Sequence, residues 1–391
     1  MKLNGNFNKL SGEYVFSQIR KIALETKIKS DDFVIDLGVG DVRLPLFKET
    51  VSAMKKACDE MQNQITFKGY PPAEGYSFLR EKIANEYLGG GMDICFDEVF
   101  ITDGAKGQLG NVLELFERGI DVLFQAPCYP AGAESNVILG NNVSFAVGNK
   151  ENGFIPYPPI NKRYDVVYLC SPNNPTGSVM NKSDLKSWVN YALNTNAVII
   201  FDSAYSAYVS GDYPRSIYQI ENAKYCAIEI NSFSKSLGFT GIRCGYTVIP
   251  KELNGLNSLY QKWLGRRFNG VSYISQRGAE SIFDKECRQK LIKRINYYKT
   301  NAEILKIALK NLNLWYNNTV CSPYVFAKTP NGVTSWEFCA MLAKKLSIIA
   351  TPGSGFLQGG EGYFRLSAFA HRDDVLDASD RLTQKGKSLF N

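Results

Sequence analysis

Apolar positions in residues 98–249 form short continuous runs, each followed by a glycine-containing turn or a helical stretch. The runs at 98–103, 121–125, 164–169, 197–201 and 225–230 lack the alternation of half-buried strands, so they predict strands buried on both faces. Strand–helix–strand units of this kind favour a mostly parallel sheet with helices on both faces. The pattern therefore predicts an α/β fold, with one more apolar strand at 241–249.

Outside this region the apolar spacing is mainly helical, with short strands between the helices. We expect strands at 33–37, 324–328, 347–350 and 362–367, and an arginine-bearing loop at 263–270. Helices are expected at 14–24, 46–61, 271–283, 285–312, 334–345 and 372–385. Since 391 residues exceed the size of most single cores, we expect two domains. We predict an N-terminal segment at 1–48 that joins the small domain, a large domain at 49–283 and a small α+β domain at 284–391.

Composition narrows the possible functions. The net charge is +7, but the basic residues are scattered, which argues against nucleic-acid binding. The nine cysteines include no Cys-x-x-Cys pair, which indicates reduced thiols in a cytoplasmic protein and no zinc site. No apolar run is long enough to cross a membrane. The single histidine, His371, argues against multi-histidine metal sites and a Ser-His-Asp triad; a capping or packing role suits it better.

Side chains with useful chemistry follow the predicted strands at their carboxyl ends. Tyr129, Asn174, Asp202 with Tyr205, and the 232–235 turn each come directly after an apolar strand. Open α/β sheets bind ligands at this edge. We therefore expect these residues to converge on one site.

The most informative turn contains Ser232, Ser234 and Lys235, with Arg243 shortly after it. A deprotonated lysine can form a Schiff base with an aldehyde, and hydroxyls with a guanidinium can hold a phosphate. Pyridoxal phosphate (PLP) carries both groups on one ring. The alternative is that Lys235 is an ordinary solvated loop lysine.

Asp202 ends an all-apolar strand, so its carboxylate should be largely buried. A cationic partner keeps a buried carboxylate charged, and a protonated pyridine nitrogen is such a partner. Asn174 and Tyr205 could then bond the phenolate oxygen of the same ring. The alternative for Asp202 is a helix cap at the end of the strand.

Three motifs together resemble the fold-type I, class I aminotransferases that use PLP. They are Ser171-Pro-Asn-Asn-Pro-Thr-Gly177, Asp202-x-x-Tyr205 and Ser232-Phe-Ser-Lys-x-x-Gly-x-x-Gly-x-Arg243. Further phrases, among them Lys68-Gly-Tyr70, Arg267-Phe-Asn-Gly-Val-Ser272 and the segment 361–369, are similar to the LL-diaminopimelate branch of that family. The resemblance covers residues 14–372 and implies a seven-stranded sheet, a homodimer with shared active sites, and transfer of an amino group between amino and keto acids.

The resemblance also implies a role for each matching residue. Lys235 would be the Schiff-base lysine and proton carrier, Asp202 the partner of the pyridine nitrogen, and Tyr205 a catalytic group at the ring oxygen. The other cofactor contacts would be Ala105, Lys106, Tyr129, Asn174, Ser232, Ser234, Arg243 and, from a second subunit, Tyr70. Substrate would be bound by Gly40, Lys106, Tyr129, Asn174 and Arg365, and by Tyr14 and Asn269 from the neighbouring subunit.

Three departures from the family pattern leave the substrate more open than the reaction. Pro71 and Gly132 stand where the family has glycine and tyrosine, and residues 107–110 also differ. The branch implies conversion of tetrahydrodipicolinate and glutamate to LL-diaminopimelate and 2-oxoglutarate. The alternatives are an aminotransferase acting on aspartate, alanine or aromatic amino acids, a PLP lyase or aminocyclopropane-type synthase, and a PLP-fold protein kept only for binding.

Overall fold

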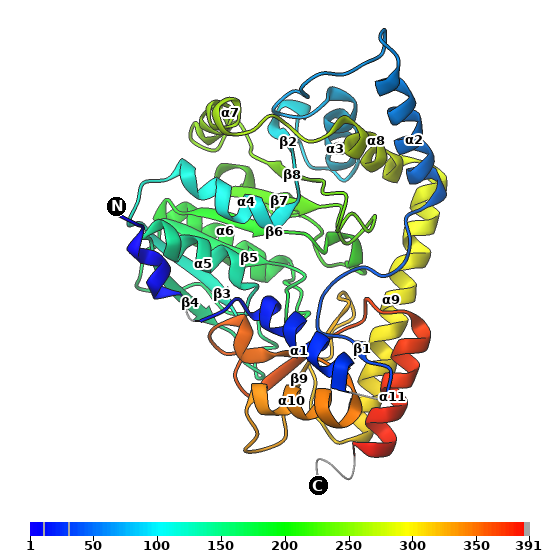
Figure 1. The fold of residues 1–391 in the computed structure, drawn as a ribbon. Helices are drawn as coiled ribbons and strands as arrows, with labels where there is room; N and C mark the ends of the chain where they lie inside the picture. The colour runs from blue at the N-terminus through cyan, green and yellow to red at the C-terminus, as the bar shows by residue number, and fades with distance from the viewer. Residues whose placement is uncertain (11, 30–31, 387–391) are drawn as a thin grey trace.

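The computed structural model describes residues 1–10, 12–29 and 32–386. Figure 1 shows a larger body built around one sheet, a smaller body that contains both α1 and α11, and a long helix, α9, that runs along the side of both. The predicted boundaries at residues 48 and 283 stay predictions. Residues 11, 30–31 and 387–391 of the predicted domains lie outside the described part.

The larger body contains a seven-stranded, mostly parallel sheet, as predicted. The strand order is β2-β8-β7-β6-β5-β3-β4, and β8 is antiparallel to both of its neighbours while the other pairs are parallel. The strands are β2 (Val99–Thr102), β3 (Asp121–Ala126), β4 (Asn142–Val147), β5 (Val166–Cys170), β6 (Val198–Asp202), β7 (Ala227–Ser232) and β8 (Gly245–Val248).

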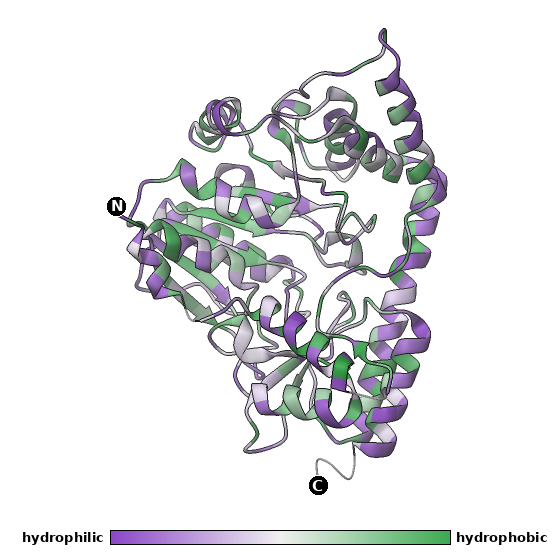
Figure 2. Cartoon of the chain, in the orientation of Figure 1, coloured by the Kyte–Doolittle hydropathy of each residue, from purple (hydrophilic) through white to green (hydrophobic). Residues whose placement is uncertain are grey.

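Both faces of this sheet are covered, which explains the continuous apolar runs. Ile199 and Phe201 of β6 belong to one core, around Trp188, whereas Ile200 between them belongs to another core, around Tyr260. The larger body holds α2 (Lys48–Gln62), α3 (Ser77–Gly89), α4 (Ala105–Asn111), α5 (Pro130–Leu139), α6 (Lys182–Thr195), α7 (Leu256–Arg267) and α8 (Tyr273–Glu280). Figure 2 shows the strands as mainly hydrophobic and the outer helices as mixed.

The smaller body combines the N-terminal segment with the C-terminal third of the chain. Here β1 (Ile35–Asp36) pairs in parallel with β10 (Ile348–Ile349), and β12 (Tyr363–Ser367) lies between β9 (Tyr324–Lys328) and β11 (Thr351–Pro352). Its helices are α1 (Val15–Lys29), α10 (Ser335–Leu346), α11 (Arg372–Lys385) and the far part of α9 (Lys285–Asn311). The α+β prediction for this part is confirmed.

Several local predictions differ from the structure. Residues 263–267 form the end of α7 and not a loop, because Leu264 is fully buried while the arginines stay at the surface. The pattern did not predict α5, which starts at Pro130, or β4, an edge strand whose residues are only partly buried. His371 is the residue before α11, although its side chain forms no capping hydrogen bond. Among the described helices none has the length and apolarity needed to span a bilayer.

Candidate active site

One cavity of about 680 Å³ lies where β6 and β7 end, and it contains nearly all of the predicted site residues. The predicted residues that line it are Tyr14, Gly40, Ala105, Lys106, Tyr129, Asn174, Asp202, Tyr205, Ser232, Ser234, Lys235, Arg243 and Arg365. Residues after β3, β5, β6 and β7 converge because the carboxyl ends of parallel strands meet at one edge. The small body contributes Arg365 from β12.

Lys235 presents its amine in this cavity, on the turn after β7. Nζ donates a hydrogen bond to the carbonyl of Gly40 and lies 5.4 Å from the centre of the Phe369 ring. Burial lowers the pKa of Lys235 to about 8; the carboxylate of Asp41 opposes this shift, and Arg365 and Arg243 reinforce it. A substantial fraction of the amine is therefore neutral near physiological pH.

Asp202, the last residue of β6, has a buried carboxylate, and few interactions within the chain offset its loss of hydration. Its Oδ1 accepts a hydrogen bond from the backbone N–H of Ala204 at 3.0 Å, and only 9% of the residue is exposed. Burial raises the pKa of Asp202 to about 6. Within the described chain this carboxylate takes part in no ion pair. The position suits a cationic N–H from a bound ligand.

Arg365 forms a buried cationic corner of the cavity. Its Nη1 donates to Oδ1 of Asn174 at 2.6 Å, its Nη2 donates to the Gly38 carbonyl, and its Nε–H is buried without a partner. Only 1% of Arg365 is exposed. A buried guanidinium with an unused donor is suited to a carboxylate ligand.

Gly40 closes this corner beneath Tyr324. A Cβ at residue 40 would lie 2.2 Å from the hydroxyl of Tyr324, so no larger residue fits without displacement. That hydroxyl also shares a 2.7 Å hydrogen bond with the hydroxyl of Tyr205. The Tyr205 side chain is thereby fixed at the cavity wall.

Arg243 forms a second cationic corner, next to α4. Its Nη1 donates to Oγ of Ser234 at 3.1 Å, and the N–H of Ser234 donates to Oγ of Ser232 at 3.1 Å. A Cβ at Gly104 would lie 2.4 Å from Nη2 of Arg243, so glycine is needed for this approach. In the described residues Arg243 has no carboxylate partner. Its donors, the two hydroxyls and the nearby Ala105 and Lys106 suit a phosphate.

Tyr14 lies in the cavity of its own chain, so the prediction that it comes from a neighbouring subunit is wrong. Its hydroxyl donates to the hydroxyl of Tyr129 at 2.8 Å, and Nζ of Lys106 lies 4.5 Å from the centre of its ring. The reason is the packing of α1: Val15 and Ile19 are buried with Ile349 in the small body, which holds the preceding residue at the cavity.

Tyr70 and Asn269 do not line the cavity. Tyr70 is 88% exposed, and Asn269 is also at the surface. The two segments that carry them touch, because a Cβ at Gly270 would lie 2.4 Å from the carbonyl of Pro72. Their predicted contribution to a second subunit stays a prediction.

The sequence did not single out several residues that line the cavity. Asp41 stands directly after Gly40, and its charge near Lys235 could have been inferred from its place in the glycine loop. Tyr324, Phe16 and Arg20 carried no comparable signal, because they reach the cavity from elements whose positions depend on the packing of the small body.

Comparisons with known proteins agree with this geometry. The family model described as "Aminotransferase class I and II" matches residues 32–378. An LL-diaminopimelate aminotransferase of Bacteroides fragilis is 44% identical, with 98% of this chain and 99% of the relative covered. The solved L,L-diaminopimelate aminotransferase of Chlamydomonas reinhardtii is 33% identical with a TM-score of 0.92, covering 100% of this chain and 99% of the other.

A more distant comparison extends the likeness in fold. The aspartate aminotransferase of Thermus thermophilus superposes with a TM-score of 0.88 at 21% identity, over 98% of this chain and 99% of the other. These matches show the fold-type I architecture that the resemblance implied. The chain belongs to the class I and II aminotransferase family and, within it, groups with the relatives named LL-diaminopimelate aminotransferase.

Proposed function

We propose that this enzyme is a PLP-dependent LL-diaminopimelate aminotransferase. It would convert tetrahydrodipicolinate and glutamate to LL-diaminopimelate and 2-oxoglutarate, a reaction that supplies precursors for lysine and the cell wall. Relatives of that name at 44% identity over nearly the whole chain support this substrate. The observation that carries the chemistry is one cavity that holds a lysine amine and a buried carboxylate between two guanidinium corners, Arg243 and Arg365.

The donor set fits PLP. Its phosphate would be held by Ala105, Lys106, Ser232, Ser234 and Arg243, its ring nitrogen by Asp202, and its ring oxygen by Asn174 and Tyr205, with Tyr129 on the face of the ring. When bound, PLP supplies an aldehyde for the amino group and a protonated ring that withdraws electrons from the substrate Cα.

The residues of the chain then have separate tasks. Nζ of Lys235 removes the proton from the substrate Cα and returns a proton later in the cycle, and its lowered pKa suits both directions. Asp202 remains ionised opposite a cationic N–H and so keeps that proton in place. Arg365 binds the α-carboxylate, which orients the Cα–H bond toward the amine.

Neither Pro71 nor Gly132 lines this cavity. Gly132 lies in α5 behind Tyr129, where a Cβ would be 3.0 Å from the ring of Phe124. This departure therefore concerns packing behind the site and does not by itself change the surface that meets substrate. A second candidate is an aminotransferase for another amino acid. It rests on the remaining departure, residues 107–110, because Leu109 of that stretch lines the cavity.

Rapid mixing tests the proposal. The purified, PLP-loaded protein is mixed with LL-diaminopimelate and separately with glutamate, and the absorbance of the bound cofactor is followed. Conversion to the aminated cofactor with both amino acids is the expected result. Conversion with glutamate alone would favour the second candidate, and a protein that binds no PLP would refute the proposal.

Arg365→Lys should raise KM for amino and keto acids roughly 10- to 100-fold, with a smaller change in kcat. Lysine keeps the charge but loses the two-pronged grip and the bond to Asn174, and a charge-assisted hydrogen bond contributes about 1.5–3 kcal/mol. Steady-state kinetics with both substrates measure the split. An unchanged KM would remove Arg365 from substrate binding.

The pKa of Lys235 predicts how fast the cofactor-free protein takes up PLP. With a pKa of about 8, the neutral fraction of the amine rises roughly tenfold from pH 7 to pH 9 and then levels off. An unperturbed lysine, with a pKa of about 10.4, would rise roughly 100-fold over the same range. Stopped-flow uptake of PLP at a series of pH values separates the two outcomes.

We also propose that two copies of the chain form a homodimer that shares its active sites and works in the cytoplasm. The exposed apolar side chains Ile65 and Phe67, on the loop that carries Tyr70, support a contact with a second copy. All nine cysteines are free, in accord with a reducing compartment.

A further inference from the structure

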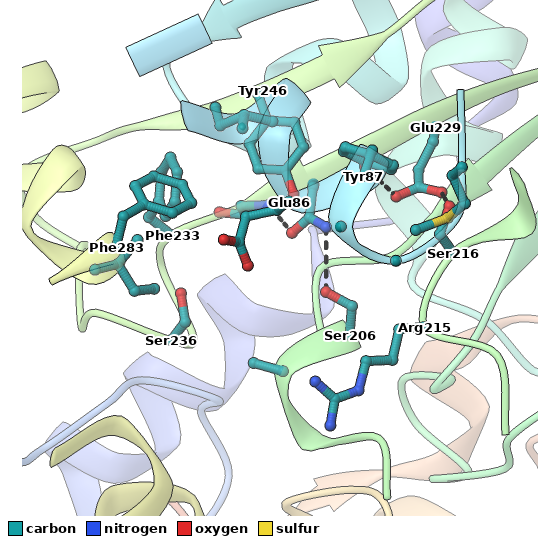
Figure 3. Close-up of a pocket in the computed structure, with 18 of the residues that line it drawn as sticks. Glu86, Tyr87, Ser206, Arg215, Ser216, Glu229, Phe233, Ser236, Tyr246 and Phe283 are labelled. Atoms are coloured by element: carbon teal, nitrogen blue, oxygen red, sulfur yellow. Dashed lines mark hydrogen bonds between the residues drawn. The ribbon is translucent and has the colours of Figure 1, made fainter. Parts of the chain in front are cut away.

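A second cavity of about 660 Å³ lies on the other side of the loop that carries Lys235. It is bounded by the end of α3, the start of α9 and the turns after β6 and β7, and Figure 3 shows the side chains around it. Its volume is within the range of sites that bind small molecules. None of the proposed steps of the transamination uses it.

The walls of this cavity combine an aromatic side with a polar side. Phe233, Tyr246 and Phe283 lie together in Figure 3, while Ser206 and Arg215 lie across the space from them. Rings arranged in this way offer faces and edges to a flat apolar body. The ligand should therefore contain an aromatic or similar flat group.

The acidic residues of the cavity are already satisfied. The carboxylate of Glu229 accepts hydrogen bonds from the hydroxyls of Tyr87, Ser203 and Ser216 and from the N–H of Ile217. Glu86 is paired through both oxygens with Arg288. Neither carboxylate calls for a cationic ligand.

Arg215 is the charged residue of the cavity that has no carboxylate partner in the described part of the chain. Its Nη2 donates to the carbonyl of Val209 at 3.3 Å, and within the described ranges its guanidinium forms no ion pair. Its other N–H groups are free to bind a planar carboxylate in a two-pronged manner. We propose that this second cavity binds a small aromatic carboxylate, with the ring against Phe233, Tyr246 and Phe283 and the carboxylate on Arg215.

Only a thin wall separates this ligand from the active-site cavity. Ala204 and Ser232 line both cavities. Nδ2 of Asn231 donates to the hydroxyls of Ser203 at 3.0 Å and Ser206 at 3.1 Å, while its Oδ1 accepts from the N–H of Ser232 at 2.8 Å. A ligand that moves Ser206 thus perturbs the backbone on both sides of the PLP site, and the coupling must act in both directions.

Titration calorimetry with 2-naphthoate tests the site in the full-length, PLP-loaded protein. We expect one binding event per chain, about two- to fivefold tighter than for the neutral 2-naphthalenemethanol, because an ion pair with the exposed Arg215 contributes up to about 1 kcal/mol. Arg215→Gln should abolish this preference. Arg163→Gln, which removes an exposed arginine elsewhere, should keep it.

A further variant shows in which of the two cavities the probe binds. Arg365→Lys alters the active-site corner, so it should leave 2-naphthoate binding unchanged. Weakening by Arg365→Lys and not by Arg215→Gln would place the probe in the active site and overturn the proposal, as would the absence of binding at about 10 mM probe. The absorbance of bound PLP should shift with 2-naphthoate in the unmodified protein and not in Arg215→Gln; binding without such a shift would overturn the coupling.

Discussion

Lys235→Ala should reduce turnover roughly 100- to 10,000-fold or more, because the variant loses the group that moves the substrate Cα proton. Nζ of Lys235 is the amine placed by the β7 turn beside Gly40, Asp202 and both guanidinium corners. Exchange of the substrate Cα hydrogen for solvent deuterium, followed by NMR, should fall by the same factor as kcat. This second readout ties the loss to proton transfer and not to weaker binding.

A matched variant and a chemical rescue make this result specific. Lys251→Ala removes a surface lysine that pairs with Asp97, and it should leave turnover unchanged. A small primary amine such as methylamine should restore part of the activity of Lys235→Ala, since it can occupy the space of the lost side chain and accept the proton. Normal activity in Lys235→Ala would refute the assignment of Lys235.

The sheet and most of the site could be predicted because both follow from local patterns. Strands buried on both faces, such as β5 to β7, consist of apolar runs of only five or six residues bounded by turns, and this short length favours a buried strand over a buried helix. Once those strands are parallel, the residues after them must meet at one edge, and Asp202 and Lys235 do. The helix at 372–385 was also predicted at its observed bounds.

The remainder depended on long-range packing, which no local pattern contains. Tyr14 is held in its own chain by the contacts of α1 with the small body, so a position implied by resemblance alone was wrong. Tyr324 contacts Tyr205 across 119 positions of sequence. The second cavity is formed by segments spread from residue 83 to residue 292, and none of these segments contains a sequence motif that predicts ligand binding.

Asp202→Asn should have opposite effects on the stability of the cofactor-free and the PLP-loaded protein. In the unfolded chain an aspartate has a pKa of about 3.9. In the folded, cofactor-free protein burial raises the pKa of Asp202 to about 6. Between these values the folded state binds more protons than the unfolded state, so stability falls as pH rises through this window and remains lower above it. At pH 7 the ionised carboxylate costs about 3 kcal/mol, which asparagine removes.

The cofactor-free Asp202→Asn protein should therefore melt a few degrees higher than the unmodified protein at pH 7, while at pH 4 the two should melt together. Asparagine can keep the bond to the Ala204 N–H. With PLP bound the order should reverse, because the cationic ring nitrogen loses its carboxylate, and turnover should fall at least about 100-fold.

Exposed Asp212, changed to asparagine, is the control and should shift neither melting temperature. A lower melting temperature for cofactor-free Asp202→Asn would mean that the carboxylate stabilises the empty site. Burial of the Asp202 carboxylate would then not destabilise the cofactor-free protein, and the argument that this carboxylate is kept there to bind a cationic ligand would fail.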